Sequence, residues 1–346
     1  MDHVTSRPVV AHVVDKYDSG VRSVIESYVD LAREVDHRVL AGSCVGDYPP
    51  TVEVVGGGLP FRALRIRSRV RHLRPDLVHA HSSVAGAYAR ALMPRSTFVY
   101  QPHCYAFEAL SFPWAARRLF LAVERLLARG TAVTVAVSRH EEELARSVVR
   151  APMVRVVPNS TDLESPTPTE SRLSDGADQV VVGSGRLCPQ KDPVTFARVA
   201  SAVRRQFPRV RFIWIGDGDS ALRRILEAEG VEVTGWLGRE QVRRSMLDAD
   251  LMMHTAAWEG FPVSIIDAVA LGLPVVALDI PSLRAEGVHT VPEAGALVDA
   301  VIRSLTDDTF QAELRSRSLK ISRRMSRFEQ SRHIRAVYAD VLAGVV

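Results

Sequence analysis

The sequence is poor in cysteine and contains no long hydrophobic run. Its three cysteines, Cys44, Cys104 and Cys188, are widely scattered over 346 residues. They therefore predict neither a disulfide framework nor a zinc site. No apolar stretch reaches the roughly 20 residues that a bilayer-spanning helix needs. The N-terminus, MDHVTSRPVVAHVVD, has no basic region followed by an apolar stretch, so we expect no secretory signal and a cytoplasmic protein.

Several cofactor-binding signatures are also missing. No GxGxxG follows a predicted strand, which argues against an NAD-dependent dehydrogenase, and no GxxxxGK[ST] loop occurs. No cluster of His, Cys, Asp and Glu has metal-ligand spacing, so we expect no metal and no other cofactor. The composition, 47% hydrophobic and 24% charged, is that of a globular protein, and the length allows two domains.

Short apolar segments alternate with helical stretches along nearly the whole sequence. Segments that are apolar on both faces predict parallel sheets covered by helices on both sides. A stretch rich in Ser, Thr, Pro and Asp near 160–179 interrupts the pattern and is typical of a linker. We therefore predict an α/β protein with two doubly wound, Rossmann-like domains that face a cleft. The predicted strands are 8–14, 37–42, 52–55, 76–81, 97–103, 132–138 and 154–159 before the linker, and 180–185, 210–216, 231–235, 251–256 and 274–279 after it.

The segment WEGFPVSIIDAVALGLPVVA, residues 258–277, places two acids around a predicted helix start. Pro262 suits the first turn of a helix, and Gly272 with Pro274 predicts its end. Glu259 would then lie on the loop before a helix N-terminus, which favours anions and above all phosphate. Glu259 and Asp267 can also be a solvated loop acid and the polar face of an ordinary helix. A ligand that carries both phosphate and hydroxyl groups would explain both acids.

Two glycine-containing loops follow predicted strands of the second half. The loop GSGRLCPQKDP, residues 183–193, combines Gly185 with the cations Arg186 and Lys191. Cations beside glycines at the end of a strand suit a diphosphate, although a solvent-facing loop would look the same. The segment GDGD, with Gly216 and Gly218, has the same character and is weaker evidence for a phosphate site.

The first half offers fewer chemical signals. Ser19 and Gly20 follow the first predicted strand at the start of a helix, and His103 ends the strand TFVYQPH. His103 can point into the predicted cleft or serve the structure. His79 and His81 lie on one face of a strand, where we favour packing and strand-end hydrogen bonds over a metal site, because no third ligand is close in the sequence.

Taken together, these motifs resemble the family 4 retaining glycosyltransferases, which have the GT-B fold. The family pattern is a G-R-L…K loop, a strand with G-x-G, and E-G-F-x-x-x-x-x-E followed by A-x-x-x-G-x-P-V-V. The stretches DLVHAHS, VAVSRHEEE and VPNSTD also match in kind, so the resemblance covers almost the whole chain. The main motifs here are Gly185-Arg186-Leu187…Lys191, Gly216-Asp217-Gly218, Glu259-Gly260-Phe261, and Ala268…Gly272 with Pro274-Val275-Val276.

The resemblance implies roles for the second-half residues. Arg186 and Lys191 would hold the donor diphosphate and neutralise the leaving group. Glu259 would lie against the hydroxyls of the donor sugar. Asp267 would grip the ribose, although it is one methylene shorter than the Glu that is usual there. The backbone at Gly260 and Phe261, together with Pro262, would support the sugar and the phosphate.

The resemblance also implies a domain order and a reaction. An acceptor-side domain, 1–160, would carry His103 near the donor sugar and β-phosphate, and Ser19 and Gly20 near the acceptor. A linker, 161–179, would lead to a nucleotide-sugar-binding domain, 180–326, and a closing helix, 327–346, would cross back to the first domain. The expected partners are a nucleotide-sugar donor and a lipid-linked or glycan acceptor, in polysaccharide biosynthesis. A catalytically silent binding partner and a UDP-sugar 2-epimerase are the alternatives, and intact Arg186, Lys191 and Glu259 argue against the epimerase.

Two stretches suggest an anionic membrane surface as a further partner. FRALRIRSRVRHLRP, residues 61–75, has six arginines and no acid, and residues 109–130 mix Phe112, Trp114 and Phe120 with four arginines. Residues 61–75 have few aromatic side chains among their arginines, which argues against binding of single-stranded nucleic acid, because such binding uses aromatic stacking. Leu119, Val123, Leu126 and Leu127 keep helical spacing, so we expect part of this stretch to pack inward. The hypothesis is a peripheral enzyme on the inner face of the cytoplasmic membrane; the alternative is a core helix with a solvated basic rim.

Overall fold

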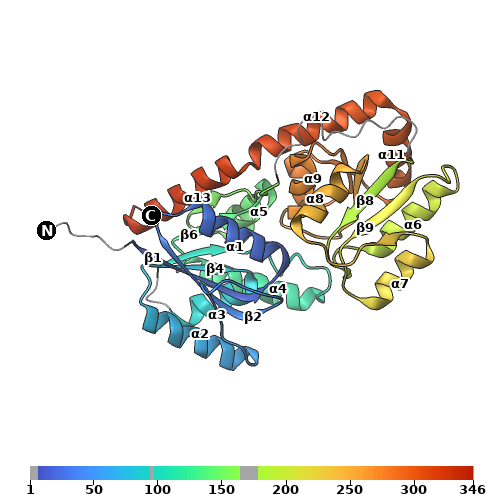
Figure 1. Cartoon of the computed structure of the whole chain (residues 1–346). Coiled ribbons are helices and arrows are strands. Elements are labelled where there is room, and N and C mark those ends of the chain that lie inside the picture. Colours follow the sequence, from blue (N-terminus) through green and yellow to red (C-terminus); the bar gives the residue numbers. More distant parts are fainter. Residues whose placement is uncertain (1–6, 94–96, 164–177, 346) are drawn as a thin grey trace. The chain divides into compact units, whose positions relative to one another are not determined.

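The computed structural model describes residues 7–93, 97–163 and 178–345. The chain forms two compact units (Figure 1). Unit 1 comprises residues 1–160 together with 327–346, and unit 2 comprises residues 161–326. Most of the predicted linker, 161–179, lies outside the described residues.

Unit 1 is built on a seven-stranded parallel sheet. Its strand order is β3-β2-β1-β4-β5-β6-β7, so the chain winds outward from β1 in one direction and from β4 in the other. The central strands are buried on both faces, as the continuous apolar runs predict. The strands are β1 (Val9–Tyr17), β2 (Asp36–Cys44), β3 (Val52–Val54), β4 (Leu77–His81), β5 (Phe98–Gln101), β6 (Val133–Ala136) and β7 (Val154–Val156).

Helices cover the sheet of unit 1. Helix α3 contacts both α2 and α4, and these three helices share a core with residues of β1, β4 and β5. Helix α1 packs on a separate core with β1 and β2 and contacts the C-terminal helix α13. The helices are α1 (Ser19–Leu31), α2 (Leu59–Leu73), α3 (Ser83–Leu92), α4 (Trp114–Ala128), α5 (Arg139–Glu143), the π-helical segment η1 (Leu144–Val149) and α13 (Arg327–Leu342).

Unit 2 contains a six-stranded parallel sheet with the order β10-β9-β8-β11-β12-β13. The short strand β13 was not predicted, because HTV is too short and too polar to stand out. The strands are β8 (Val180–Ser184), β9 (Arg211–Ile215), β10 (Glu232–Val233), β11 (Leu251–His254), β12 (Val275–Leu278) and β13 (His289–Val291). The helices are α6 (Pro193–Arg204), α7 (Ser220–Ala228), α8 (Arg239–Leu247), α9 (Val263–Ala270), α10 (Pro281–Glu286), α11 (Ala294–Thr306) and α12 (Asp308–Arg324).

Each sheet has one point at which the direction of winding reverses. In unit 1 this switch point lies between β1 and β4, and in unit 2 it lies between β8 and β11. Loops that leave neighbouring strands there run to opposite faces of the sheet, which opens a crevice at the carboxyl edge. The predicted α/β fold with two doubly wound sheets and a C-terminal helix is confirmed. Among the described residues, no helix is both long enough and apolar enough to cross a bilayer.

Candidate functional site

The loops after β8 and β11 meet at the switch point of unit 2. The backbone N–H of Ala257 donates to the Gln190 carbonyl at 2.9 Å, and Nε2 of Gln190 donates to the Trp258 carbonyl at 2.9 Å. The Thr255 hydroxyl lies 3.0 Å from the carbonyl oxygens of both Lys191 and Asp192. These bonds fix the two loops together, so side chains that are far apart in the sequence share one site.

Lys191 and Glu259 face each other across this junction. Nζ of Lys191 lies 2.6 Å from Oε1 of Glu259, and the two side chains are only 16% and 12% exposed. Apart from this ion pair, Oε1 is buried and has no hydrogen-bond partner among the described residues. A neutral pair with unused hydrogen-bonding capacity can bind a ligand that offers an anion to the lysine and hydroxyl groups to the glutamate.

The N-terminus of α9 adjoins the same loop. Gly260, Phe261 and Pro262 are buried, and the helix begins at Val263, so Pro262 precedes the first turn that we predicted it would occupy. Oγ of Ser264, in that first turn, is buried and has no hydrogen-bond partner among the described residues. A helix N-terminus with an unused hydroxyl is suited to an anionic ligand.

The glycines in the loops after β8 and β9 are also required by the packing of the backbone. A Cβ on Gly216 would lie 2.2 Å from the Gly185 carbonyl oxygen, and one on Gly218 would lie 2.5 Å from the Leu187 carbonyl oxygen. Both have positive φ, 133° and 154°, which glycine adopts without strain. The glycines therefore let the loops after β8 and β9 cross closely. Arg186 extends from this crossing and is exposed.

Asp267 is buried in a network that the sequence did not reveal. Arg239, the first residue of α8, donates from Nη1 to Oδ2 at 2.9 Å and from Nη2 to Oδ1 at 3.1 Å. The Thr161 hydroxyl donates to Oδ1 at 2.5 Å, and Arg239 also pairs with Asp162. Burial alone would lower the pKa of Arg239, but the two carboxylates outweigh it and raise the pKa. Both oxygens of Asp267 are thus engaged, and no sequence motif linked this residue to Arg239.

The predicted residues of unit 1 lie at the carboxyl ends of its strands. Ser19 and Gly20 open α1 directly after β1, and His103 follows β5. His103 and Cys104 both have positive φ, 53° and 92°. Such backbone is strained in residues other than glycine and persists only where other contacts hold it. Here the Cys104 N–H donates to Oε1 of the buried Glu141 at 2.7 Å.

Two family models match this sequence. One, described as Glycosyltransferase Family 4, matches residues 28–165, and the other, described as Glycosyl transferases group 1, matches residues 178–307. Each falls largely within one of the two units. The chain belongs to glycosyltransferase family 4.

Relatives and solved structures agree with this assignment. The Bacillus subtilis (strain 168) protein TuaC, a glycosyltransferase named for teichuronic acid biosynthesis, is 27% identical over 323 residues, 86% of this chain and 80% of that protein. The Escherichia coli UDP-Gal:alpha-D-GlcNAc-diphosphoundecaprenol alpha-1,3-galactosyltransferase is 25% identical over 234 residues, 59% of this chain and 58% of that protein. Anabaena HepE, crystallised with UDP and glucose, matches at a TM-score of 0.76 and 20% identity, over 96% of this chain and 99% of that one. The structural similarity shows the GT-B fold.

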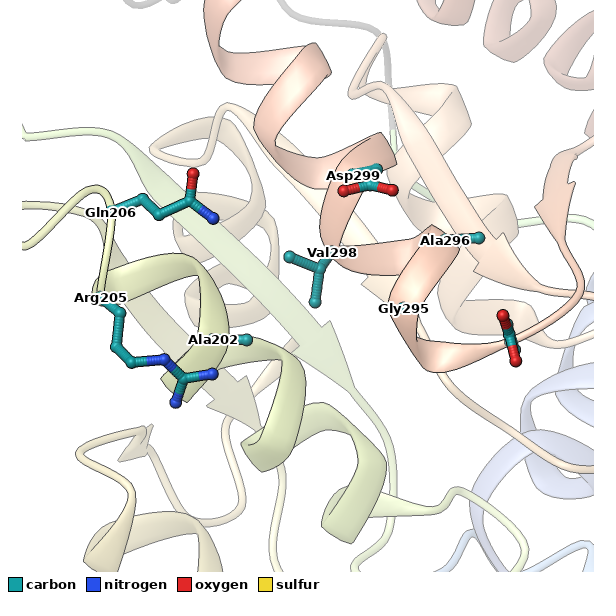
Figure 2. Close-up of a pocket in the computed structure, with 8 residues that line it drawn as sticks. Ala202, Arg205, Gln206, Gly295, Ala296, Val298 and Asp299 are labelled. Atoms are coloured by element: carbon teal, nitrogen blue, oxygen red, sulfur yellow. The ribbon is translucent and has the colours of Figure 1, made fainter.

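This family 4 glycosyltransferase also has a hollow between α6 and α11 of unit 2 (Figure 2). Its walls carry one basic residue, Arg205, and two acids, Glu293 and Asp299, among smaller side chains. None of the predicted donor-binding residues lines it. An acidic wall does not suit a diphosphate.

Proposed function

We propose that this glycosyltransferase moves a sugar from a nucleoside-diphosphate sugar to an acceptor hydroxyl with retention of anomeric configuration. The observation that carries the proposal is the shielded Lys191–Glu259 pair at the switch point of unit 2. In parallel α/β sheets, ligands bind beyond the carboxyl ends of the strands at this point. The pair offers both of the interactions that such a donor needs.

Departure of the nucleoside diphosphate is the step that needs stabilisation, because negative charge develops on the leaving phosphate. Lys191, Arg186 and the N-terminus of α9 would supply positive charge that is already in position. Glu259 holds Lys191 while the site is empty, and in the complex its carboxylate would accept hydrogen bonds from sugar hydroxyls. Lys191, Arg186 and the N-terminus of α9 together would offset the charge of the leaving phosphate, so the proposed mechanism requires no metal.

Retention is proposed from the resemblance to the family. The acceptor oxygen would attack from the face that the diphosphate leaves, and the leaving phosphate oxygen would take the hydroxyl proton. One C–O bond to the acceptor then forms as the C–O bond to phosphate breaks. No side chain becomes covalently attached to the sugar.

We propose that Asp267 contributes to the ribose site through its network. Its carboxylate is already bound by Arg239 and Thr161, so a ribose hydroxyl would have to share or replace the Thr161 contact. The shorter side chain of Asp, compared with Glu, fits a carboxylate that anchors Arg239 as well as a ligand. Arg239 therefore joins the candidate donor-binding residues.

We propose uridine diphosphate sugars as the first donors to test and a cell-surface glycan or glycolipid as the product. The support is the UDP in the HepE crystals, the UDP-Gal in the name of the E. coli relative, and the teichuronic acid in that of the B. subtilis one. A thermal-shift screen with UDP-, GDP- and ADP-sugars tests the donor, because a ligand that binds only the folded protein raises its melting temperature.

The activity test is donor hydrolysis and transfer followed by NMR. The transferred sugar should keep the anomeric configuration of the donor, and slow hydrolysis without acceptor should release nucleoside diphosphate. Binding without hydrolysis or transfer would favour a silent binding protein. An inverted product would overturn the retaining mechanism.

We also propose that unit 1 docks on an anionic membrane surface. Part of α4 packs inward, as predicted, since Val123 and Leu127 are partly buried, but Leu119 and Leu126 are 61% and 68% exposed and Trp114 is 70% exposed. The inward face of α4 instead uses smaller or partly buried side chains such as Phe120 and Ala128. The exposed face therefore combines apolar side chains with the exposed arginines Arg118, Arg125 and Arg129, as interfacial helices do.

Helix α2 supports this surface less strongly than its sequence suggested. Arg62 is paired with Asp15 at 2.6 Å and Arg69 with Glu53 at 2.6 Å, so two of its five arginines are already engaged. Phe61 and Leu64 are exposed beside Arg65. We infer that α4 contributes more than α2 to membrane binding.

Vesicle co-sedimentation tests the membrane proposal. Binding should need anionic lipid and fall with salt, and each arginine of α4 changed to Glu should weaken it by about 1 kcal/mol or more. The triple variant of α2, Arg65→Glu with Arg67→Glu and Arg69→Glu, should weaken vesicle binding less than the same number of Arg→Glu changes on α4. Equal recovery in the supernatant with neutral and anionic vesicles at low salt would point to an acceptor that is not at a membrane.

A further inference from the structure

Four histidines form a continuous hydrogen-bonded row across the sheet of unit 1. His37 lies on β2, His12 on β1, His81 on β4, and His103 follows β5, and these strands are neighbours in the sheet. Nδ1 of His37 lies 2.8 Å from Nε2 of His12, Nδ1 of His12 lies 2.9 Å from Nε2 of His81, and Nδ1 of His81 lies 2.9 Å from Nε2 of His103. The row crosses the switch point between β1 and β4.

One backbone carbonyl sets the direction of every hydrogen bond in the row. Nε2 of His37 lies 2.9 Å from the carbonyl oxygen of Ala32, the residue that caps the C-terminus of α1. A carbonyl can only accept, so His37 carries its proton on Nε2, and a neutral imidazole then has a lone pair on Nδ1. His12 must donate to that lone pair, His81 to His12, and His103 to His81. Nδ1 of His103 is therefore left as a hydrogen-bond acceptor.

The rings of this row are neutral, which the assignment requires. His12 and His81 are fully shielded from solvent and His37 is 6% exposed. Burial is the main cause that lowers the pKa of each of them, and it lowers the pKa of His103 to about 3. An imidazole with such a pKa is a poor general base near neutral pH, so the row orients a hydrogen bond and does not carry a proton away.

The backbone around His103 is held from a second side. Glu141 accepts from the N–H groups of Cys104 and Val137, both at 2.7 Å, and so fixes the positive-φ turn at His103 and Cys104. His81 holds the ring of His103, and Glu141 holds the backbone N–H of the next residue, Cys104. Strained backbone that is fixed by two independent contacts is characteristic of functional sites.

We propose that His37, His12 and His81 are positioning residues that fix His103 as its Nε2–H tautomer, so that Nδ1 accepts a hydrogen bond from a substrate hydroxyl. The hydroxyl belongs to the acceptor or to the donor sugar. A bare Nδ1 repels a phosphate oxygen, so this ring recognises a hydroxyl and not the diphosphate. The proposal rests on the sugar transfer proposed above, although the tautomer itself does not depend on it.

A metal ion is the competing explanation for these histidines. His12, His79 and His81 each place a nitrogen within 4.8 Å of the others. However, Nδ1 of His12 and Nε2 of His81 share one hydrogen at 2.9 Å, and the His79 and His81 rings are stacked with centroids 4.1 Å apart. A metal would have to break the row and lie in the planes of stacked rings, so the hydrogen-bonded row fits the geometry better.

Long-range 1H–15N correlation spectra of the 15N-histidine-labelled full chain test the tautomer directly. They should show a proton on Nε2 and a bare Nδ1 for His103, which is assigned by its loss in His103→Asn. In His37→Leu the row loses its fixed end, so His103 should become a mixture of tautomers and kcat/KM should fall by about tenfold, the size of one lost hydrogen bond. His37→Gln can donate to Ala32 and accept from His12, so it should restore both.

His79→Asn is the matched control, because His79 is equally buried and its Nδ1 bonds to the Tyr338 hydroxyl at 2.9 Å outside the row. It should leave the His103 spectrum unchanged.

A higher KM for the acceptor in His37→Leu would identify the acceptor hydroxyl, and a higher KM for the donor would identify the sugar hydroxyl. A protonated Nδ1 on wild-type His103, an unchanged tautomer in His37→Leu, or one bound metal per chain would overturn the inference. A correct tautomer in a protein that transfers no sugar would overturn the proposed function alone.

Discussion

Both units of this glycosyltransferase are doubly wound sheets with polar side chains at the switch point, but these side chains are neutral in unit 1 and charged in unit 2. In unit 1, neutral histidines join in a row at the switch point between β1 and β4. In unit 2, a lysine and a glutamate form an ion pair at the switch point between β8 and β11. In the proposed mechanism the neutral row orients a hydroxyl, whereas the charged groups would bind and stabilise phosphate.

This difference shows that a doubly wound sheet fixes where a ligand binds but not which ligand binds. The loops at the strand ends bring side chains together in both units. Buried imidazoles stay neutral because burial opposes their charge, and the ion pair persists because each partner offsets the charge of the other. Experiments that change charge should therefore affect the two units differently.

Acid should distinguish the units most strongly. Burial lowers the pKa of His12, His37, His79, His81, His103 and His333 in unit 1, but only of His254 and His289 in unit 2 among the described residues. Below about pH 6.5 the unfolded chain binds protons on these imidazoles more readily than the folded chain does. The free energy of unfolding of unit 1 should then fall as the pH falls, by at most about 1.4 kcal/mol per pH unit for each such histidine.

Calorimetry between pH 7.5 and 5 measures this loss. Glu141 and His140 act in the opposite direction. Burial raises the pKa of Glu141 to about 7, and, although burial opposes it, Glu108 raises the pKa of His140, so the folded state binds both protons first, but these two groups offset only two of the six histidines. Two melting transitions should separate as the pH falls, with unit 1 melting earlier. Transitions that stay together down to pH 5 would contradict the neutral row.

Loss of a donor-site cation should have the next largest effect. Lys191→Ala or Arg186→Ala should lower kcat of transfer by about 10²–10³-fold, the size expected for one charge-stabilising contact at a leaving group. Lys320→Ala, an exposed lysine on α12, is the control. Near-full activity in both donor-site variants would remove them from the mechanism.

Glu141→Gln should have a smaller effect, which is measured here as the stability of unit 1. The Gln amide has one acceptor oxygen, so the N–H of Cys104 or of Val137 loses its partner at about 1–3 kcal/mol. The melting temperature of unit 1 should fall. In the wild type, Glu141 makes the free energy of unfolding decline as the pH rises from about 4.5 to about 7, and this contribution should be absent in Glu141→Gln. Glu143→Gln, on the same helix but exposed, should change neither property. An unaltered melting temperature in Glu141→Gln would mean that the turn does not depend on Glu141.

Chelation should have no effect at all. EDTA should leave transfer unchanged, because cations and the α9 N-terminus supply the charge in the proposed mechanism. A sharp loss of activity that added metal restores would replace this mechanism with a metal-assisted one.

The strands and the donor loops could be predicted because their signals are local. Apolar runs bounded by turns gave the strands near their observed bounds, and the motifs around Lys191 and Glu259 fall on the loops that meet. Strand β13 was missed because three residues carry too little pattern. Helical spacing identified an apolar stripe on α4 but could not show which of its residues are covered, and Leu119 and Leu126 are exposed.

The histidine row and the Arg239 network could not be predicted, because both depend on long-range order. His37 and His12 become neighbours only once the sheet order β2-β1-β4-β5 is known. Arg239 reaches Asp267 across 28 residues without a motif around either residue that signals the pair. Sequence could identify these residue types, and the fold alone decides which of them touch.

Calorimetric titration with UDP and UDP-glucose tests the central claim, that the β8–β11 junction of unit 2 binds the donor. The wild-type chain should bind both ligands. Lys191→Ala should bind UDP about tenfold or more weakly, the size of a lost charge-assisted contact. Glu259→Gln should keep its fold and its affinity for UDP but lose the additional affinity that the sugar provides. If both variants bind UDP and UDP-glucose as tightly as the wild type, the donor does not bind at this junction.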